Sequence, residues 1–121
     1  MENWVRLSWV VLALIHLAPA ATAFAPSLIE RLYGVTPDGD VGVLLIHRGV
    51  LFLAVLTVSG LAVFDLTARR VASVVAAISM IGFLIVYARA GLPAGSLRAI
   101  AWADAIGLVP LAIVTYAAWR A

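Results

Sequence analysis

The sequence contains 121 residues, of which 65% are hydrophobic and only 12% are charged. A soluble domain of this length is usually about half apolar, so the excess apolar surface is expected to face a lipid bilayer. The net charge is +2, and the eight basic residues, all arginine, are scattered apart from one adjacent pair, which excludes a basic nucleic-acid-binding patch. The absence of cysteine excludes disulfides, thiol redox chemistry and cysteine-ligated metals. A chain this short predicts one domain, residues 1–121.

The first apolar run, residues 5–24, is long enough at about 20 residues to cross a hydrocarbon core ~30 Å thick. A cleavable signal peptide is the competing interpretation, with residues 7–17 as its apolar segment and Ala21-Thr22-Ala23 as a small-residue cleavage site. We favour a retained span, because the residues before the run are net neutral and His16 interrupts it. Pro19 removes one helical hydrogen bond and is therefore expected to kink the helix.

The connector after this run is predicted to hold a short amphipathic helix, residues 28–33. Ser27 and Glu30 have the spacing of a capping box at its start, and Gly34 suits the left-handed residue at its end. Its apolar side is expected either to lie on the membrane interface or to fold over the mouth of a helical bundle. Asp40 is expected to cap the helix that follows.

Three further apolar runs predict membrane-spanning helices at residues 41–64, 71–90 and 97–119. A polar hinge, residues 65–70, and a turn, residues 91–96, separate them. Short connections produce antiparallel neighbours, so the predicted fold class is all-α, a four-transmembrane-helix up-down-up-down bundle. A soluble bundle is the alternative, but no run has the polar face that it would require.

An even number of spans places both termini and the polar hinge on the same side of the membrane. That side carries four arginines against three on the other side, where acidic residues offset them. Basic residues are enriched on the cytoplasmic side of membrane proteins. The sequence therefore predicts that both termini are cytoplasmic.

Four ionisable residues lie at similar depth within the predicted spans. At ~1.5 Å per residue, His16 lies ~12 Å, His47 and Arg48 ~9–10 Å and Asp104 ~10 Å from the non-cytoplasmic face. A charge in hydrocarbon costs at least ~2.5–3.5 kcal/mol, so such residues usually face inward and pair. Arg48 and Asp104 are the expected ion pair, which either fixes the register of two helices or takes part in a ligand site. That all four residues face one another is assumed from their depth.

Stripes at helical spacing on three of the predicted helices indicate an apolar cavity with this charged layer at its mouth. The stripes consist of Arg48, Phe52, Val55 and Ser59, of Ala76, Ser79, Phe83 and Tyr87, and of Ala101, Asp104, Leu108, Leu111 and Thr115. Tyr87 is expected near the mouth and could add a hydroxyl. An aromatic belt at the membrane interfaces is the alternative for Tyr87 and for the four tryptophans.

The two histidines allow a sharper hypothesis. His16 and His47 could both ligate a b-type haem iron, because bundles often hold cofactors between facing helices. A proton relay through histidine and Asp104 is another option, and a bond to a backbone carbonyl is the simple structural account of His16. A metal site formed by two histidines and Asp104 is disfavoured by the adjacent charge of Arg48. Nucleotide loops and hydrolase motifs are absent, so we expect binding or structural support rather than catalysis.

Short motifs add a resemblance that covers nearly the whole chain. They are Ile15-His16-Leu17-Ala18-Pro19 and Phe24-Ala25-Pro26 around the end of the first run, and His47-Arg48 in the second. With the length and the four spans, the sequence resembles the DoxX-like family of small bacterial four-helix membrane proteins. The resemblance implies an integral protein of the bacterial inner membrane. Some members of that family are subunits of membrane oxidoreductases that pass electrons to quinone.

The sequence thus predicts a small membrane protein that binds an amphiphile of lipid, quinone or isoprenoid type. The predicted site comprises His16, His47, Arg48, Asp104 and Tyr87. The alternative is an accessory or structural subunit of a larger membrane complex, or a homo-oligomer, in which the polar cluster only locks helix packing.

Overall fold

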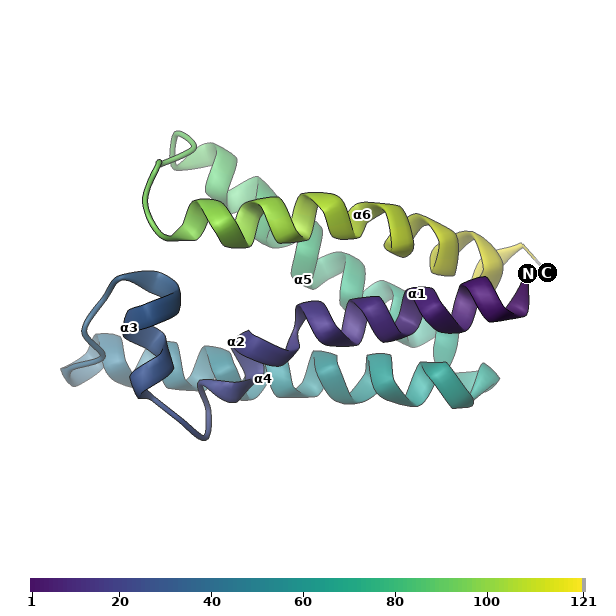
Figure 1. Ribbon diagram of the computed structural model, residues 1–121, viewed down its shortest axis with the longest axis horizontal. Helices are drawn as coiled ribbons and strands as arrows, with labels where there is room; N and C mark the ends of the chain where they lie inside the picture. Colours follow the sequence, from purple (N-terminus) through teal and green to yellow (C-terminus); the bar gives the residue numbers. More distant parts are fainter. Residues whose placement is uncertain (121) are drawn as a thin grey trace.

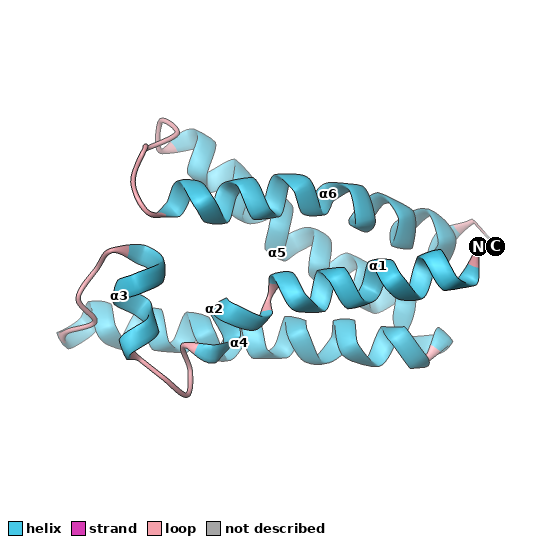
Figure 2. Cartoon of the chain, in the orientation of Figure 1, coloured by secondary structure: helices cyan, strands magenta, loops and turns pink. Residues whose placement is uncertain are grey.

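The computed structural model describes residues 1–120, and all the regular structure in this range is helical, as Figure 2 shows. The elements in chain order are α1 (Glu2–Ile15), α2 (Leu17–Ala21), α3 (Ser27–Tyr33), α4 (Gly39–Phe64), the 3₁₀ turn η1 (Leu66–Ala68), α5 (Arg69–Arg89) and α6 (Leu97–Trp119). The predicted all-α class is confirmed. Three segments are long and apolar enough to cross a membrane: α4, the combined η1–α5 segment and α6.

The long helices lie side by side and alternate in direction, with both chain termini at one end (Figure 1). This terminal end also holds the α4–α5 connection, and the opposite end holds α3 and the α5–α6 turn. α1 packs against both α4 and α6, while α5 packs against α4 and α6. Trp9 and Leu12 of α1 are fully buried in this core, so Trp9 does not belong to the interfacial belt considered for the tryptophans.

The first predicted span, residues 5–24, is divided into two helices. α1 ends at Ile15 and α2 begins at Leu17, and the His16 N–H bonds the Ala13 carbonyl at 3.1 Å in a tightened turn. Pro19 lacks an N–H, and its ring would collide with the carbonyl four residues earlier, that of Ile15. The expected kink is therefore confirmed, and it lies one turn before the proline that causes it.

Beyond this break α2 packs closely against α4, and Gly49 is where the two backbones meet. A Cβ atom at Gly49 would collide with the Thr22 hydroxyl and lie only 2.8 Å from the Ala23 amide nitrogen. Thr22 is fully buried, and its hydroxyl donates a hydrogen bond to the Pro19 carbonyl at 2.7 Å. Glycine at position 49 therefore permits α2 to leave the line of α1 and settle on α4.

α3 covers the mouth of the bundle, which was one of the two arrangements expected for it. Ile29 and Tyr33 are buried, and a Cβ atom at Gly34 would lie 2.7 Å from the Ser96 hydroxyl at the start of α6. Gly34 has φ 67°, which confirms the predicted left-handed end of the helix. The predicted capping box is wrong, because Ser27 is already inside the helix and makes no capping bond.

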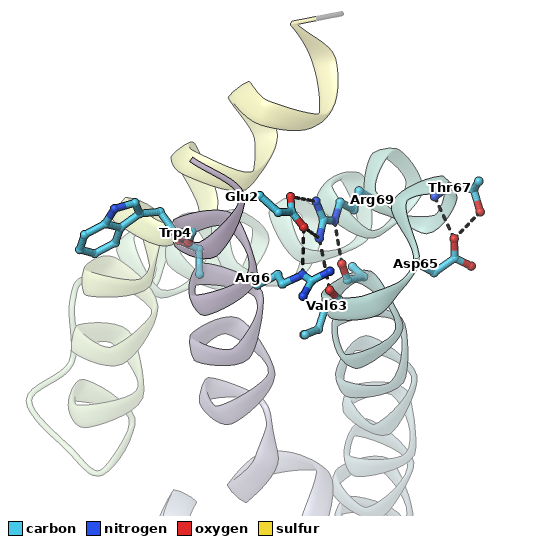
Figure 3. Close-up of polar contacts among 9 residues, drawn as sticks. Glu2, Trp4, Arg6, Val63, Asp65, Thr67 and Arg69 are labelled. Carbon is cyan, nitrogen blue, oxygen red and sulfur yellow. Dashed lines mark hydrogen bonds and ion pairs between the residues drawn. The ribbon is translucent and has the colours of Figure 1, made fainter.

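The other helix boundaries follow the prediction with small shifts. α4 begins at Gly39 after Asp38, so Asp40 is inside the helix rather than its cap. α5 begins at Arg69, two residues earlier than expected, because η1 leads into it without a break. The Asp65 carboxylate starts this turn by accepting bonds from the Thr67 amide at 2.9 Å and the Thr67 hydroxyl at 2.6 Å (Figure 3).

Arg69 joins three helices at the terminal end (Figure 3). Its side chain is 8% exposed, and its two terminal nitrogens donate to the two carboxylate oxygens of Glu2 at 2.7 and 2.9 Å. Its Nε donates to the Ala62 carbonyl at 2.8 Å and its Nη2 to the Val63 carbonyl at 3.2 Å. Both carbonyls belong to the last turn of α4, where intrahelical partners run out. We call these contacts the Arg69 clasp.

Arg70 makes a second connection at the same end. Its Nε donates to the Ala118 carbonyl at 3.0 Å, and its guanidinium carbon lies 5.1 Å from the Trp119 ring centroid. The Trp119 indole N–H donates to the Ser73 hydroxyl at 3.0 Å. Two consecutive arginines thus attach the first and the last helix of the bundle to the start of α5.

The Arg69 clasp predicts an acid sensitivity that belongs to Glu2. Hydrogen bonds from Arg69 lower the pKa of Glu2 from 4.5 to about 2. Burial opposes this shift, while the charge of Arg69 and the nearby Arg6 add to it. Because this pKa is lower in the folded state, the contribution is complete above pH 4.5 and is lost as the pH falls towards 2. We expect Glu2→Gln to flatten the decline of the unfolding free energy across this range in denaturation experiments. Glu30→Gln, a change at an exposed carboxylate of α3, should keep the slope of the parent, and an unchanged slope in Glu2→Gln would contradict the assignment.

Candidate functional site

A pocket of about 230 Å³ lies between α6 and the break in the first segment. It opens there because α1 packs along α6, whereas α2 turns away beyond His16 and packs on α4. Ala18, Ala99 and Ala103 are exposed, so the open side of the pocket faces out of the bundle. The lining residues are Ile15, His16, Ala18, Pro19, Leu32, Phe52, Ala99, Ile100, Ala103 and Asp104. We call this cavity the α2–α6 pocket.

His16 forms the inner wall of the α2–α6 pocket and is 2% exposed. Its Nδ1 lies 2.8 Å from the Leu12 carbonyl, and its Nε2 lies 3.1 Å from the Ser79 hydroxyl. A carbonyl can only accept, so Nδ1 must carry the proton, and in the neutral ring Nε2 accepts from Ser79. The bond to a backbone carbonyl that the sequence allowed is present, and both ring nitrogens are engaged.

Arg48 is surrounded by aromatic rings from three helices. Its guanidinium carbon lies 4.7 Å from the ring centroid of Phe52, 5.4 Å from that of Phe83 and 5.5 Å from that of Tyr33. Ring faces attract a cation electrostatically but offer no oxygen for its N–H groups. Accordingly, the Nε of Arg48 is buried without a hydrogen-bond partner among the described residues.

The expected direct ion pair between Arg48 and Asp104 is wrong. Within residues 1–120 the ion pairs closer than 4.0 Å are those of Glu2 with Arg6 and Arg69. Asp104 is 8% exposed and lines the α2–α6 pocket beside His16. The two groups stay apart because the guanidinium lies against rings of α3, α4 and α5, while the carboxylate comes from α6.

His47 does not join the cluster, because its side chain is exposed. Successive residues of an α-helix point about 100° apart, so the side chains of His47 and Arg48 leave α4 in different directions. The pair of haem ligands suggested by His16 and His47 is therefore not brought together, whereas His16 and Asp104, which could form the proton relay, line the same pocket. Within the described part of the chain, no three histidine, aspartate or glutamate side chains are grouped as metal ligands would be.

Tyr87 belongs to another part of the bundle. Its hydroxyl donates to the Pro93 carbonyl, and its ring stacks on Phe83 with centroids 5.9 Å apart. It lines a separate pocket of about 350 Å³ between α5 and α6, with Arg98 and Trp102. The structure therefore gives Tyr87 a role in holding the α5–α6 turn.

Some residues of the site were missed from the sequence. Leu32 and Tyr33 come from α3 and contribute a pocket wall and a ring beside Arg48. The available signal was the apolar side of this short helix. Phe52, Ser79 and Phe83 were on the predicted stripes, although no contact with His16 or Arg48 was assigned to them.

The fold and the site define a small helical protein with three candidate membrane-spanning helices and a polar pocket at a helix break. No family model matches the chain, and neither the curated proteins nor the solved structures contain a match. The DoxX-like resemblance therefore stays a prediction.

Proposed function

We propose that this chain is a DoxX-like protein of the bacterial inner membrane that crosses the bilayer four times and binds an amphiphilic small molecule. The fourth crossing is the predicted span, residues 5–24, which consists of α1 from residue 5 onwards, α2 and the turn that follows it. At ~1.5 Å per residue this span covers ~30 Å, the thickness of the hydrocarbon core. The alternating helix directions, with both termini at one end of the bundle (Figure 1), support a topology that has both termini on one side of the membrane, which we assign to the cytoplasm from the arginine count.

The observation that carries the binding proposal is the composition of the α2–α6 pocket. Two buried polar side chains, His16 and Asp104, form its interior, while alanines border its open side. Its volume of about 230 Å³ is smaller than the ~300–1,000 Å³ of pockets for drug-sized ligands. Such a pocket suits the polar head and the first carbons of an amphiphile of lipid, quinone or isoprenoid type, whose chain continues into the bilayer.

Filling the pocket tests this function. Ala103→Phe places a ring at the open side of the α2–α6 pocket, and Ala112→Phe makes the same exchange at another exposed site of α6. Losing the head-group contacts, at ~1–3 kcal/mol, should lower binding of the amphiphile about tenfold or more in Ala103→Phe. Ala112→Phe should bind as the parent does.

Native mass spectrometry from lipid nanodiscs provides the measurement, because it reports bound small molecules and partner chains together. A parent protein that retains an amphiphile, and loses it only in Ala103→Phe, supports the proposal. A parent protein that carries no amphiphile but retains another protein chain would contradict it and support the accessory-subunit function.

A further inference from the structure

We propose that the α2–α6 pocket selects an uncharged, hydroxylated head group, which accepts a hydrogen bond from Arg48 and donates one to Asp104. This inference rests on the proposed function and specifies its ligand class. A long-chain or isoprenoid alcohol has this chemistry.

The donor side of the site is Arg48. Its guanidinium lies against the faces of Phe52, Phe83 and Tyr33, which satisfy none of its N–H groups. The buried Nε has no partner among the described residues. Phe52 also lines the α2–α6 pocket, and the guanidinium carbon of Arg48 lies 4.7 Å from its ring centroid. An oxygen acceptor that entered beside Phe52 would therefore meet unmatched donors.

The acceptor side is Asp104. An ionised carboxylate has about four lone-pair positions and no donor. Asp104 is buried in the pocket wall and, among the described residues, forms no ion pair with Arg48 within 4.0 Å. The neighbouring His16 cannot serve it without giving up a bond, because its nitrogens already bind Leu12 and Ser79.

The two charges decide which head group fits between them. A carboxylate ligand would be attracted by Arg48 but repelled by Asp104, and an ammonium ligand would meet the reverse. An ester or a ketone accepts a bond from Arg48 but leaves Asp104 without a donor, and an unmatched buried polar group weakens binding. A hydroxyl both accepts and donates, so it matches Arg48 and Asp104 together.

The test compares head groups on one alkyl chain. Dodecanol, dodecanoate, dodecylammonium and methyl dodecanoate are titrated into the protein in phosphatidylcholine nanodiscs, and occupancy is read by native mass spectrometry. We expect dodecanol to bind about tenfold more tightly than the other three probes, because each of those leaves a buried polar group of the site without a matching partner. Dodecanoate or dodecylammonium binding as tightly as dodecanol would overturn the proposal.

Single substitutions should then move the preference in opposite directions. Asp104→Asn removes the negative charge and should shift the preference towards dodecanoate. Arg48→Gln removes the positive charge and should shift it towards dodecylammonium. His47→Gln changes the exposed neighbour of Arg48 and should leave the ranking unchanged. A ranking that neither Asp104→Asn nor Arg48→Gln alters would overturn the proposal.

The result also separates this inference from the proposed function. If no probe binds the parent protein, both fail. A different result is that the probes bind the parent protein and Ala103→Phe blocks them, but the alcohol is not preferred. In that case only the head-group inference fails. If a substituted protein does not fold, the ranking measured on the parent decides.

Discussion

Replacing Arg69 with methionine is expected to lower the unfolding free energy by about 2–4 kcal/mol, which corresponds to one or two charge-assisted hydrogen bonds at ~1.5–3 kcal/mol each, because solvent and local relaxation replace the others. Methionine keeps most of the aliphatic stem but leaves the Ala62 and Val63 carbonyls at the end of α4 without their donor. It also leaves Glu2 without its bidentate partner. Denaturation followed by tryptophan fluorescence measures this loss, because Trp9 of α1 is buried in the core.

Two variants show which part of the Arg69 clasp matters. Glu2→Gln should cost less than about 1 kcal/mol, because the Glu2 side chain is 48% exposed and solvent screens its ion pair. Arg70→Met removes the adjacent arginine, whose single hydrogen bond is exposed, and should also have a small effect. If Glu2→Gln were as damaging as Arg69→Met, the ion pair rather than the carbonyl bonds would hold the end of α4.

The contacts of the Arg69 clasp could not be predicted from the sequence. Arg69 and Glu2 are 67 positions apart, and nothing in the local pattern relates one to the other. From the sequence, Arg69 counted only as a charge for orientation. Helix positions are different, because length, hydropathy and chain breakers are local signals. Residues 97–119 were accordingly predicted with the bounds of α6.

The sequence predicted the level of the candidate site residues along the helices, but not the direction in which their side chains point. Counting along the spans placed His16 and Asp104 at one level, and the structure brings both into the α2–α6 pocket. The same count could not show that His47 faces outward, because direction depends on which helices pack around α4. It also missed the aromatic rings around Arg48, one of which comes from α3 and depends on how that helix folds over the bundle.

Gly49 allows α2 to settle on α4 and so allows the α2–α6 pocket to open. Gly49→Ala should lower the unfolding free energy by about 1–3 kcal/mol, the usual cost of overpacking. The new methyl group would collide with the Thr22 hydroxyl and approach the Ala23 amide, and a backbone amide cannot rotate away as a flexible side chain does. α2 would have to move off α4.

Gly60→Ala, on the same helix, is the matched control, because a Cβ atom at position 60 meets nothing within 4 Å. This exchange should stabilise α4 by up to about 1 kcal/mol, the difference in helix propensity between alanine and glycine. The two substitutions add the same atom, so their opposite signs isolate the contact between α2 and α4. They should also differ in binding, because Pro19 and Ala18 of α2 form a wall of the α2–α6 pocket. If Gly49→Ala were as stable as Gly60→Ala and retained its amphiphile, the close approach at Gly49 would not be what positions that wall.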